Sequence, residues 1–328
     1  MQFTCNQLDL LVAITTVSKA ITNRTANPIL SCMLLKTEGE GKDKGLYLIG
    51  TDLELSIKSK IKANIISDGS IAVDEKLFSE IIRKIPEGII EIDTDSNNYA
   101  TIKSGKSEYK IAGQDGKDYP DIPVVERNDG ITMFQNDLKD LIKSTNFSIS
   151  KEETKPTLTG ELIEIEKGIA TLVAVDGFRI SAKKANVSLD AKNVSAIIPG
   201  IKLNEIAKNL SSNSEDTFTM YFTDKNVLFE LKDTIMVARL IDGKFINYKQ
   251  NLVDNFDTQI KVNRMDLLNS VERISLISGI DKKQPIKLEI GNDLVLTSNT
   301  TAGQGHEELE IEKEGPDLII AFNPVFLL

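Results

Sequence analysis

Basic side chains recur on the polar faces of the helices that this sequence predicts. Lys139 and Lys143 lie four residues apart, opposite the apolar side chains of the segment 134–147. The other basic residues with this placement are Arg83, Lys202, Lys208, Arg264 and Arg273. Ammonium and guanidinium groups on a helix surface can hold phosphate oxygens, which positions a nucleic-acid backbone without reading its sequence. The same residues also fit a merely solvated helix face, and the pattern alone leaves both interpretations open.

Groups that could carry covalent or metal chemistry are sparse. His306 is the single histidine, and one imidazole cannot supply a metal cluster. Cys5 and Cys32 stand in apolar, strand-like runs and are expected to be buried structural thiols. Gly303 and Gly305 are too close together for a phosphate-cradling loop, and the acidic groups at 93–95 and 152–153 are expected on solvated turns. We therefore predict no catalytic residue, no metal and no cofactor.

The helix that carries Lys139 belongs to a pattern that occurs three times. Apolar residues spaced at i, i+3, i+4 and i+7 predict one buried face. This face is expected to comprise Leu138, Leu141, Ile142 and Thr145 in the middle copy, Leu8, Leu11, Val12 and Thr15 in the first, and Met265, Leu268 and Val271 in the third. Asn6, Asn136 and Asn263 are taken as the equivalent start of each helix, with spacings of 130 and 127 residues. Such a period matches a whole domain rather than a solenoid repeat.

Two further markers follow each helix in the same order. The first is an alternating apolar and polar run around a short turn, which predicts a β-hairpin at 46–58, 170–182 and 293–311. The second is a strand that ends at Val73, Ile198 or Phe322 and leads into another helix. Short strands then predict an antiparallel meander at 88–113 and again at 217–240. Each copy is thus expected to be α+β, with two helices packed on antiparallel sheets.

The three copies predict three tandem domains, at 1–127, 128–254 and 255–328. The first copy continues for 54 residues beyond Val73, whereas the chain ends six residues after the equivalent Phe322. We therefore expect the third copy to be truncated at its C-terminus, by about 45 residues relative to the first.

Composition narrows the class of protein further. The chain has 328 residues, 41% of them hydrophobic, and no apolar run approaches the ~18 residues of a membrane helix. The N-terminus does not have the layout of a signal peptide, so we expect a cytoplasmic protein with no membrane partner. The formal net charge of −10 argues against a protein that coats itself with nucleic acid. It leaves room for a local basic surface on an otherwise acidic chain.

Tandem domains with two amphipathic helices each are compatible with a ring. Twelve helices of about 10 Å width, side by side, enclose a circle about 38 Å across at their axes and a hole of about 27 Å. Duplex DNA is at least about 16 Å across by its groove depths, so it would pass through such a hole with room for water. The six helices of one chain would leave less than about 10 Å. A ring around DNA would therefore need two chains.

Several motifs resemble one known family along the whole chain. They are the three-domain repeat, Arg24 within the segment 22–30, and the segments 50–54, 175–179 and 242–248. Together they are similar to the bacterial DNA polymerase III beta subunit family, the sliding clamps. The resemblance implies that each chain forms half of a ring, as a head-to-tail homodimer that encircles double-stranded DNA without catalysis. It also implies tethering of the DNA polymerase III alpha subunit, the clamp loader, and other clamp-binding polymerases and repair proteins.

The resemblance also implies three sets of site residues. The DNA contacts would include Arg24, Lys151, Lys155 and Lys202, although Glu152 and Glu153 intervene and Pro156-Thr157 replaces an aromatic pair of the family. The dimer interface would pair the strand at 106–111 with the strand at 306–311, through Tyr109, Ile111, Leu276, Ile277 and Leu309. The pocket for partner peptides would comprise Leu158, Val175, Gly177, Phe178, Arg179, Ile180, Ile246, Gln250 and Asn251. A truncated third copy is expected to weaken both peptide binding and the dimer.

Two other classes of protein are weighed against a clamp. An enzyme would need a convergent acid–base pair, a metal cluster or a phosphate loop, and none is evident in the sequence. A non-DNA scaffold built of repeated β-rich modules is the remaining alternative. Retention on nicked circular DNA and loss from linear DNA would distinguish a clamp from such a scaffold.

Overall fold

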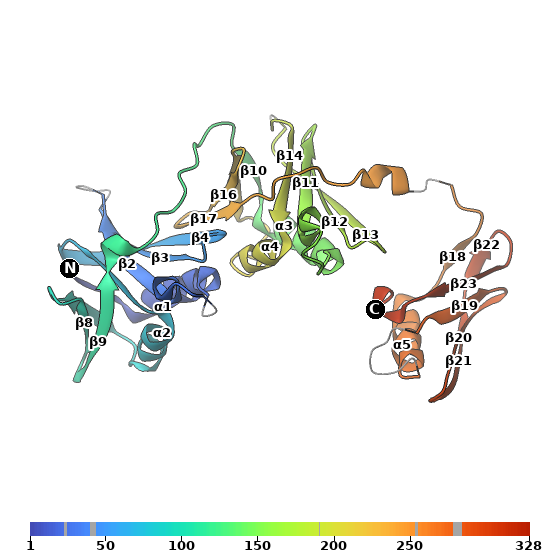
Figure 1. The fold of residues 1–328 in the computed structure, drawn as a ribbon, viewed down its shortest axis with the longest axis horizontal. Coiled ribbons are helices and arrows are strands. Elements are labelled where there is room, and N and C mark those ends of the chain that lie inside the picture. Colours follow the sequence, from blue (N-terminus) through green and yellow to red (C-terminus); the bar gives the residue numbers. More distant parts are fainter. Residues whose placement is uncertain (23–24, 40–43, 190, 253–254, 278–283) are drawn as a thin grey trace. The chain divides into compact units, whose positions relative to one another are not determined.

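The structure is a computed structural model that describes residues 1–22, 25–39, 44–189, 191–252, 255–277 and 284–328 (Figure 1). It divides into two compact units, Met1–Phe245 and Ile246–Leu328. The first unit contains two of the expected repeats and the second contains the third. Each unit is described by itself below.

The first repeat follows the expected order of strands, helix, strands, helix and meander. Its elements are β1 (Gln2–Asn6), α1 (Gln7–Val17), β2 (Cys32–Glu38), β3 (Gly45–Thr51), β4 (Leu55–Ile61), β5 (Ala63–Ser67), β6 (Ser70–Asp74), α2 (Glu75–Lys84), β7 (Ile89–Thr94), β8 (Tyr99–Ser104) and β9 (Ser107–Asp115). Both helices start at a side-chain cap, since Asn6 accepts from the Leu8 N–H at 2.8 Å and Asp74 from the Leu77 N–H at 2.8 Å.

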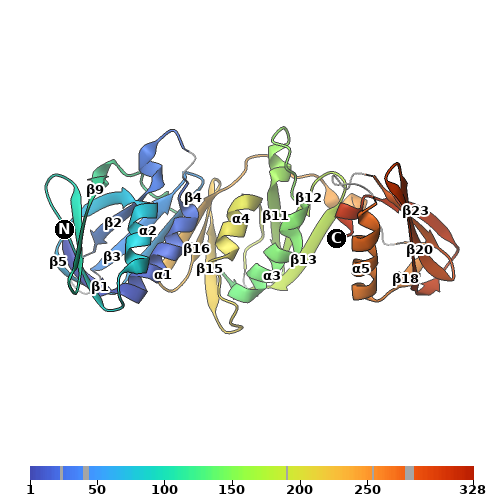
Figure 2. The same cartoon turned by 90° about the horizontal axis from the view of Figure 1, so that it is seen from below.

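The second repeat has the same order of elements, although β5 has no counterpart among its described residues. Its elements are β10 (Ile131–Phe134), α3 (Gln135–Thr145), β11 (Gly160–Glu166), β12 (Ile169–Val175), β13 (Ile180–Asn186), β14 (Val194–Pro199), α4 (Gly200–Ala207), β15 (Thr217–Phe222), β16 (Asn226–Glu230) and β17 (Thr234–Arg239). The expected hairpins and meanders are confirmed in both repeats. In Figures 1 and 2, α1 lies beside α2 and α3 beside α4, and the contacts within the unit agree.

The predicted equivalence of Asn136 with Asn6 is wrong. α3 begins at Gln135, after Phe134, and Asn136 lies inside the helix with its side-chain oxygen buried and unpaired. Gln7 and Gln135 are the equivalent residues. Each donates its backbone N–H to the residue just before the first meander strand, to Gly88 O at 2.9 Å and to Asp216 O at 2.8 Å. The helix starts are therefore 128 and 129 residues apart rather than 130 and 127.

This shift of register also explains why the predicted core face of α1 is wrong. The middle copy is confirmed, because Leu138, Leu141, Ile142 and Thr145 are all buried. In α1, however, Leu8 is 48% and Val12 67% exposed. The face that is buried comprises Gln7, Leu10, Ala13, Ile14 and Val17. In the third copy Val271 is buried as predicted, but Met265 is 46% exposed.

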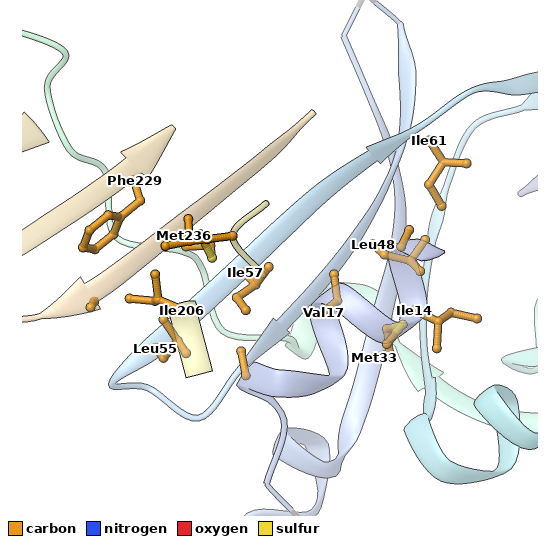
Figure 3. Packing of buried hydrophobic residues seen from close by; sticks show 14 of the residues in the cluster. Ile14, Val17, Met33, Leu48, Leu55, Ile57, Ile61, Ile206, Phe229 and Met236 are labelled. Carbon is orange, nitrogen blue, oxygen red and sulfur yellow. The ribbon is translucent and has the colours of Figure 1, made fainter. Parts of the chain in front are cut away.

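A continuous sheet joins the two repeats of the first unit. Its strand order is β10-β15-β16-β17-β4-β3-β2-β6-β9-β8-β7-β1-β5, and a second sheet has the order β13-β12-β11-β14. The two repeats meet where β17 pairs antiparallel with β4, from Thr234 opposite Ser59 to Ala238 opposite Leu55. Apolar side chains pack continuously across this seam, with Leu55 and Ile57 of one repeat near Ile206 and Met236 of the other (Figure 3). The seam is thus built from both backbone pairing and a shared core.

Among its described residues, the second unit contains one α-helix and two small sheets. Its elements are β18 (Gln259–Lys261), α5 (Arg264–Ser275), β19 (Ile286–Ile290), β20 (Asp293–Thr300), β21 (Gly303–Glu310), β22 (Glu312–Glu314) and β23 (Leu318–Phe322). Asn263 caps α5, as predicted, by accepting from the Met265 N–H at 2.8 Å. The larger sheet has the order β21-β20-β19-β23, and α5 packs Val271 and Ile274 against Leu294 and Leu296. All five residues of β23 are exposed.

Three findings bear on what the described residues can form. Cys5 and Cys32 are free and buried as predicted, and burial together with the charge of Asp9 raises the pKa of the Cys5 thiol to about 12. Among the described residues, no cluster of three or more histidine, cysteine, aspartate or glutamate side chains could hold a metal ion. No helix in that part of the chain is long and apolar enough to span a membrane.

Candidate nucleic-acid interface

Three lysines gather around the C-terminus of α4. Lys139 of α3 donates to the carbonyl of Leu210 at 3.0 Å, and Lys19, just after α1, donates to the carbonyl of Lys208 at 2.9 Å. Lys19 also donates to Asn209 Oδ1 at 2.6 Å. Lys208 is the C-cap of α4, where the partial negative charge of the helix end attracts ammonium groups, and the Leu210 carbonyl lies three residues beyond the helix. The fold thereby concentrates positive charge where three helical segments meet.

The pKa of Lys19 reflects the closeness of these positive charges to one another. Burial lowers its pKa, and the neighbouring Lys208 and Lys139 lower it further, whereas Glu205 acts in the opposite direction. Lys19 was missed in the sequence because it follows the amphipathic segment rather than standing on its polar face. Its position in the Ser18–Ala20 turn, two residues after the end of α1, is the available signal.

The other predicted DNA contacts differ in how far their charge is already paired. Lys143, Lys151, Lys155 and Arg264 are exposed. Three more form exposed ion pairs, Arg83 with Glu80 at 3.0 Å, Lys208 with Glu205 at 2.6 Å, and Arg273 with both oxygens of Glu307. Exposed pairs contribute little stability, so a phosphate can compete for the cation. Arg24 lies outside the described residues.

Lys202 is held in a different way from the rest. Its ammonium lies 2.5 Å from Asp52 Oδ2 and 3.1 Å from Glu54 Oε2, on the β3–β4 turn of the first repeat. The Lys202 and Asp52 side chains are only 14% and 15% exposed. Burial alone would lower the pKa of Lys202, but the two carboxylates outweigh it and the pKa is raised. Lys202 therefore bridges the two repeats, and its charge is already matched.

A buried carboxylate fixes α3 relative to α4. Glu161 of β11 is fully buried and accepts hydrogen bonds from Thr145 Oγ1 and from Asn146 Nδ2, the latter at 2.6 Å. Asn146 also donates to the carbonyl of Gly200 at the start of α4, at 2.7 Å. Burial raises the pKa of Glu161 to about 7, although both hydrogen bonds act to lower it. The two helices that carry the lysines are thus joined through one polar network.

The residues expected to bind partner peptides fall in both units. In the first unit Leu158 and Val175 are buried, whereas Phe178 is 80% exposed. The predicted turn at 176–177 is present, with Gly177 at a φ of +92° and open space where a Cβ would lie. Arg179 donates to Asp176 Oδ2 at 2.9 Å and to the Phe147 carbonyl at 2.6 Å. Ile180 is half-buried, and in the second unit Ile246, Gln250 and Asn251 are exposed.

The strands expected to close the dimer each have an open edge. Residues 107–112 of β9 pair with β8 alone, and only the last three residues of β9 pair with β6. Within the described part of the chain, β21 is the edge strand of its sheet and pairs only with β20. On these strands Tyr109 is 44% exposed, Ile111 is buried and Leu309 is half-buried. Leu276 is exposed and Ile277 half-buried at the end of α5.

Tandem α+β repeats joined edge to edge, with basic side chains around paired helices, define a clamp-type DNA-binding subunit. The N-terminal, central and C-terminal domain descriptions of the DNA polymerase III beta subunit match residues 1–123, 132–247 and 249–328. The chain belongs to the DNA polymerase III beta subunit family, the bacterial sliding clamps. Its function is accordingly that of a processivity factor in DNA replication.

Individual relatives agree with this assignment. The chain is 34% identical to a beta sliding clamp of Halalkalibacterium halodurans over 94% of this chain and 86% of that protein. It is 30% identical to that of Bacillus subtilis over 100% of this chain and 89% of that one. The crystal structure of a putative DNA polymerase III beta subunit from Eubacterium rectale has a TM-score of 0.95 at 34% identity, covering 100% of this chain and 88% of that one. The sliding clamp of Bacillus subtilis has a TM-score of 0.94 at 30% identity, with the same coverage.

Proposed function

We propose that two copies of this chain close into a ring around duplex DNA and slide along it without sequence preference. The ring itself catalyses no reaction. It keeps a polymerase on its template by topology, because a closed ring leaves a continuous duplex only by opening. Chromosomal DNA as the ligand implies that the ring works in the cytoplasm.

The seam inside the first unit is the observation that carries this proposal. It joins the second strand of one hairpin, β4, to the last strand of a meander, β17. β21 is the second strand of the third hairpin, and β9 is the last strand of the first meander. The two open edges are therefore of the same two kinds that already pair within the chain. Pairing β21 of one copy with β9 of another, twice, repeats the seam and gives a closed head-to-tail dimer.

The lysine cluster supports DNA as the content of the ring. Lys19, Lys139 and Lys208 surround the end of α4, and exposed Lys143 lies one turn along α3 from Lys139. These groups can contact phosphates directly or through water, which restrains the duplex without fixing it to one base sequence. The net charge of −10 for the whole chain limits non-specific adhesion to nucleic acid.

Partners would be recognised through the residues near the β12–β13 turn. The exposed Phe178 and the half-buried Ile180 and Arg179 offer apolar contact beside a guanidinium, which suits a short peptide with an apolar anchor. We propose that the DNA polymerase III alpha subunit, the clamp loader, and other clamp-binding polymerases and repair proteins use this surface. No cofactor or membrane is needed for this role.

Retention on circular DNA tests the proposal. The protein is loaded with a clamp loader onto nicked circular plasmid, separated from free protein by gel filtration, and the DNA is then linearised with a restriction enzyme. We expect retention on the circle and release after linearisation. Equal retention on both forms would indicate ordinary surface binding, and absence from both would indicate a scaffold that does not encircle DNA.

A further inference from the structure

A hollow of about 400 Å³ lies between α3 and α4. Its lining includes Lys139, Ile142, Lys143, Phe147, Ala207 and Lys208. Three of these are lysines, whereas Ile142, Ala207 and Phe147 give the hollow an apolar part. Duplex DNA contacts a protein mainly through its phosphates, and these would not fill an apolar hollow. The lining of the hollow therefore fits a ligand that is both anionic and partly apolar.

Phe147 is the most distinctive member of this lining. Its side chain is 59% exposed, and the guanidinium of Arg179 lies 5.3 Å from the centroid of its ring. Arg179 also binds the Phe147 carbonyl at 2.6 Å and Asp176 at 2.9 Å, so the cation beside the ring is fixed by three contacts. An exposed aromatic ring backed by a held cation is a stacking platform for a flat π system.

Single-stranded DNA combines the features that the hollow requires. Each nucleotide carries one phosphate and one base, and proteins that bind single strands pair cationic grooves with aromatic rings on which bases stack. An acidic peptide would satisfy the lysines, but its carboxylate side chains would not use the exposed ring. Charge and shape together favour the nucleotide.

We propose that the hollow between α3 and α4 binds an unpaired nucleotide of single-stranded DNA, with its base stacked on Phe147 and its phosphates near Lys143 and Lys208. The inference rests on the proposed function, because it places single-stranded DNA next to the surface that faces the duplex. Such a nucleotide occurs where a duplex ends in a single-stranded template. Occupation of the hollow would hold the ring at that junction.

Binding of a labelled oligothymidylate to the full-length protein tests the proposal. Fluorescence anisotropy gives the affinity at several salt concentrations, and an oligothymidylate with a single 2-aminopurine reports stacking of that base. We expect Phe147→Ala to weaken binding about tenfold and Phe147→Trp to preserve it. Lys143→Gln is expected to reduce the slope of log affinity against log salt by about 0.7. Phe256→Ala, which removes an exposed phenylalanine of the second unit, is the matched control and should bind as the unmodified protein does.

The outcomes separate this inference from the proposed function. If the unmodified protein stays on nicked circles but binds oligothymidylate equally well with Phe147→Ala and Phe256→Ala, the hollow is not the nucleotide site. Unchanged 2-aminopurine fluorescence in the complex would also overturn the inference. Binding of an oligoglutamate peptide that exceeds oligothymidylate binding, and that is lost in Phe147→Ala, would assign the hollow to an acidic peptide instead. Thermal melts and retention of Phe147→Ala on nicked circles verify that the fold and the ring persist.

Discussion

Replacing Glu161 with glutamine should abolish one component of the pH dependence of stability. The carboxyl group lies at the centre of the network that joins Thr145, Asn146 and the start of α4, and it is fully buried. Burial raises its pKa from 4.5 to about 7. The folded protein therefore holds a proton at pH 6 that the unfolded chain has released.

The sign and size of the effect follow from linkage. A group whose pKa is raised on folding stabilises the folded state fully below its unfolded pKa, and this contribution is lost as the pH rises through the folded pKa. One pKa unit corresponds to about 1.36 kcal/mol, so a rise from 4.5 to about 7 is worth about 3 kcal/mol. We expect that amount of stability to disappear between about pH 4.5 and pH 7 in the unmodified protein.

Urea unfolding of both proteins from pH 4.5 to 8.5 measures the effect. Glutamine resembles the protonated carboxyl in shape and cannot ionise, so Glu161→Gln should lack this decline. Other ionisable groups titrate alike in both proteins and cancel in the difference between them. Glu166→Gln, at an exposed position on the same strand, is the control and should follow the unmodified protein.

Parallel stability curves for the unmodified protein and Glu161→Gln would refute the reasoning. They would mean that Glu161 ionises with its ordinary pKa, and therefore that water or a structural adjustment reaches the site. An unmodified protein that gains stability relative to Glu161→Gln as the pH rises would contradict the sign, because it would assign the stabilising interaction to the charged form.

Three further changes test other parts of the structure. Lys202→Met should destabilise the first unit by about 1–3 kcal/mol in urea unfolding, since it leaves Asp52 and Glu54 without their shared cation. In the double variant with Asp52→Asn, the decrease in the free energy of unfolding should be smaller than the sum of the two single decreases. Lys208→Gln should lower the salt slope of duplex binding by about 0.9 without unfolding the protein, because its ion pair with Glu205 is exposed; an unchanged slope would remove Lys208 from the DNA surface. Tyr109→Lys should weaken self-association at least about tenfold in analytical sedimentation, because a charge on an edge strand opposes pairing with another strand; an unaltered dimer would show that this edge is not the interface.

Most of the fold could be predicted from hydrophobic periodicity, and the exceptions have one origin. The hairpins, the meanders and the face of α3 follow from local alternation and helical spacing. The sequence predicts the wrong face of α1 as buried because Asn136, a residue type typical of N-caps, aligns with Asn6. In the folded protein Phe134 occupies that place and no side chain caps α3. An alignment of the repeats by their polar N-cap residues fails where one repeat has no such residue. The buried glutamines at 7 and 135 instead mark equivalent positions of the two helices.

Long-range polar contacts could not be predicted at all. Lys202 has the spacing of a residue on a solvated helix face, and its partners Asp52 and Glu54 stand 150 and 148 residues away in the sequence. The same holds for Lys19, whose acceptors lie at the end of α4. Periodicity reports which face of a helix is apolar but carries no information on which surface approaches the other face. For charged residues, the distinction between a bridge and a free cation emerges only once the repeats are docked.

The lysine cluster connects the stability of the seam to the capacity to bind DNA. Lys19 belongs to the first repeat and its acceptors belong to the second, so the contact that places positive charge at the end of α4 also holds the two repeats together. Asn209 strengthens this junction by donating back to the Thr16 carbonyl at 3.3 Å. A cation used in this way is fixed in position, and the neighbouring Lys208 remains exposed for a mobile ligand. A surface with one structural lysine beside exposed ones attracts a duplex through its positive electrostatic potential, but only a few of its charges bind the phosphates directly. Attraction without tight binding is the electrostatic requirement for sliding.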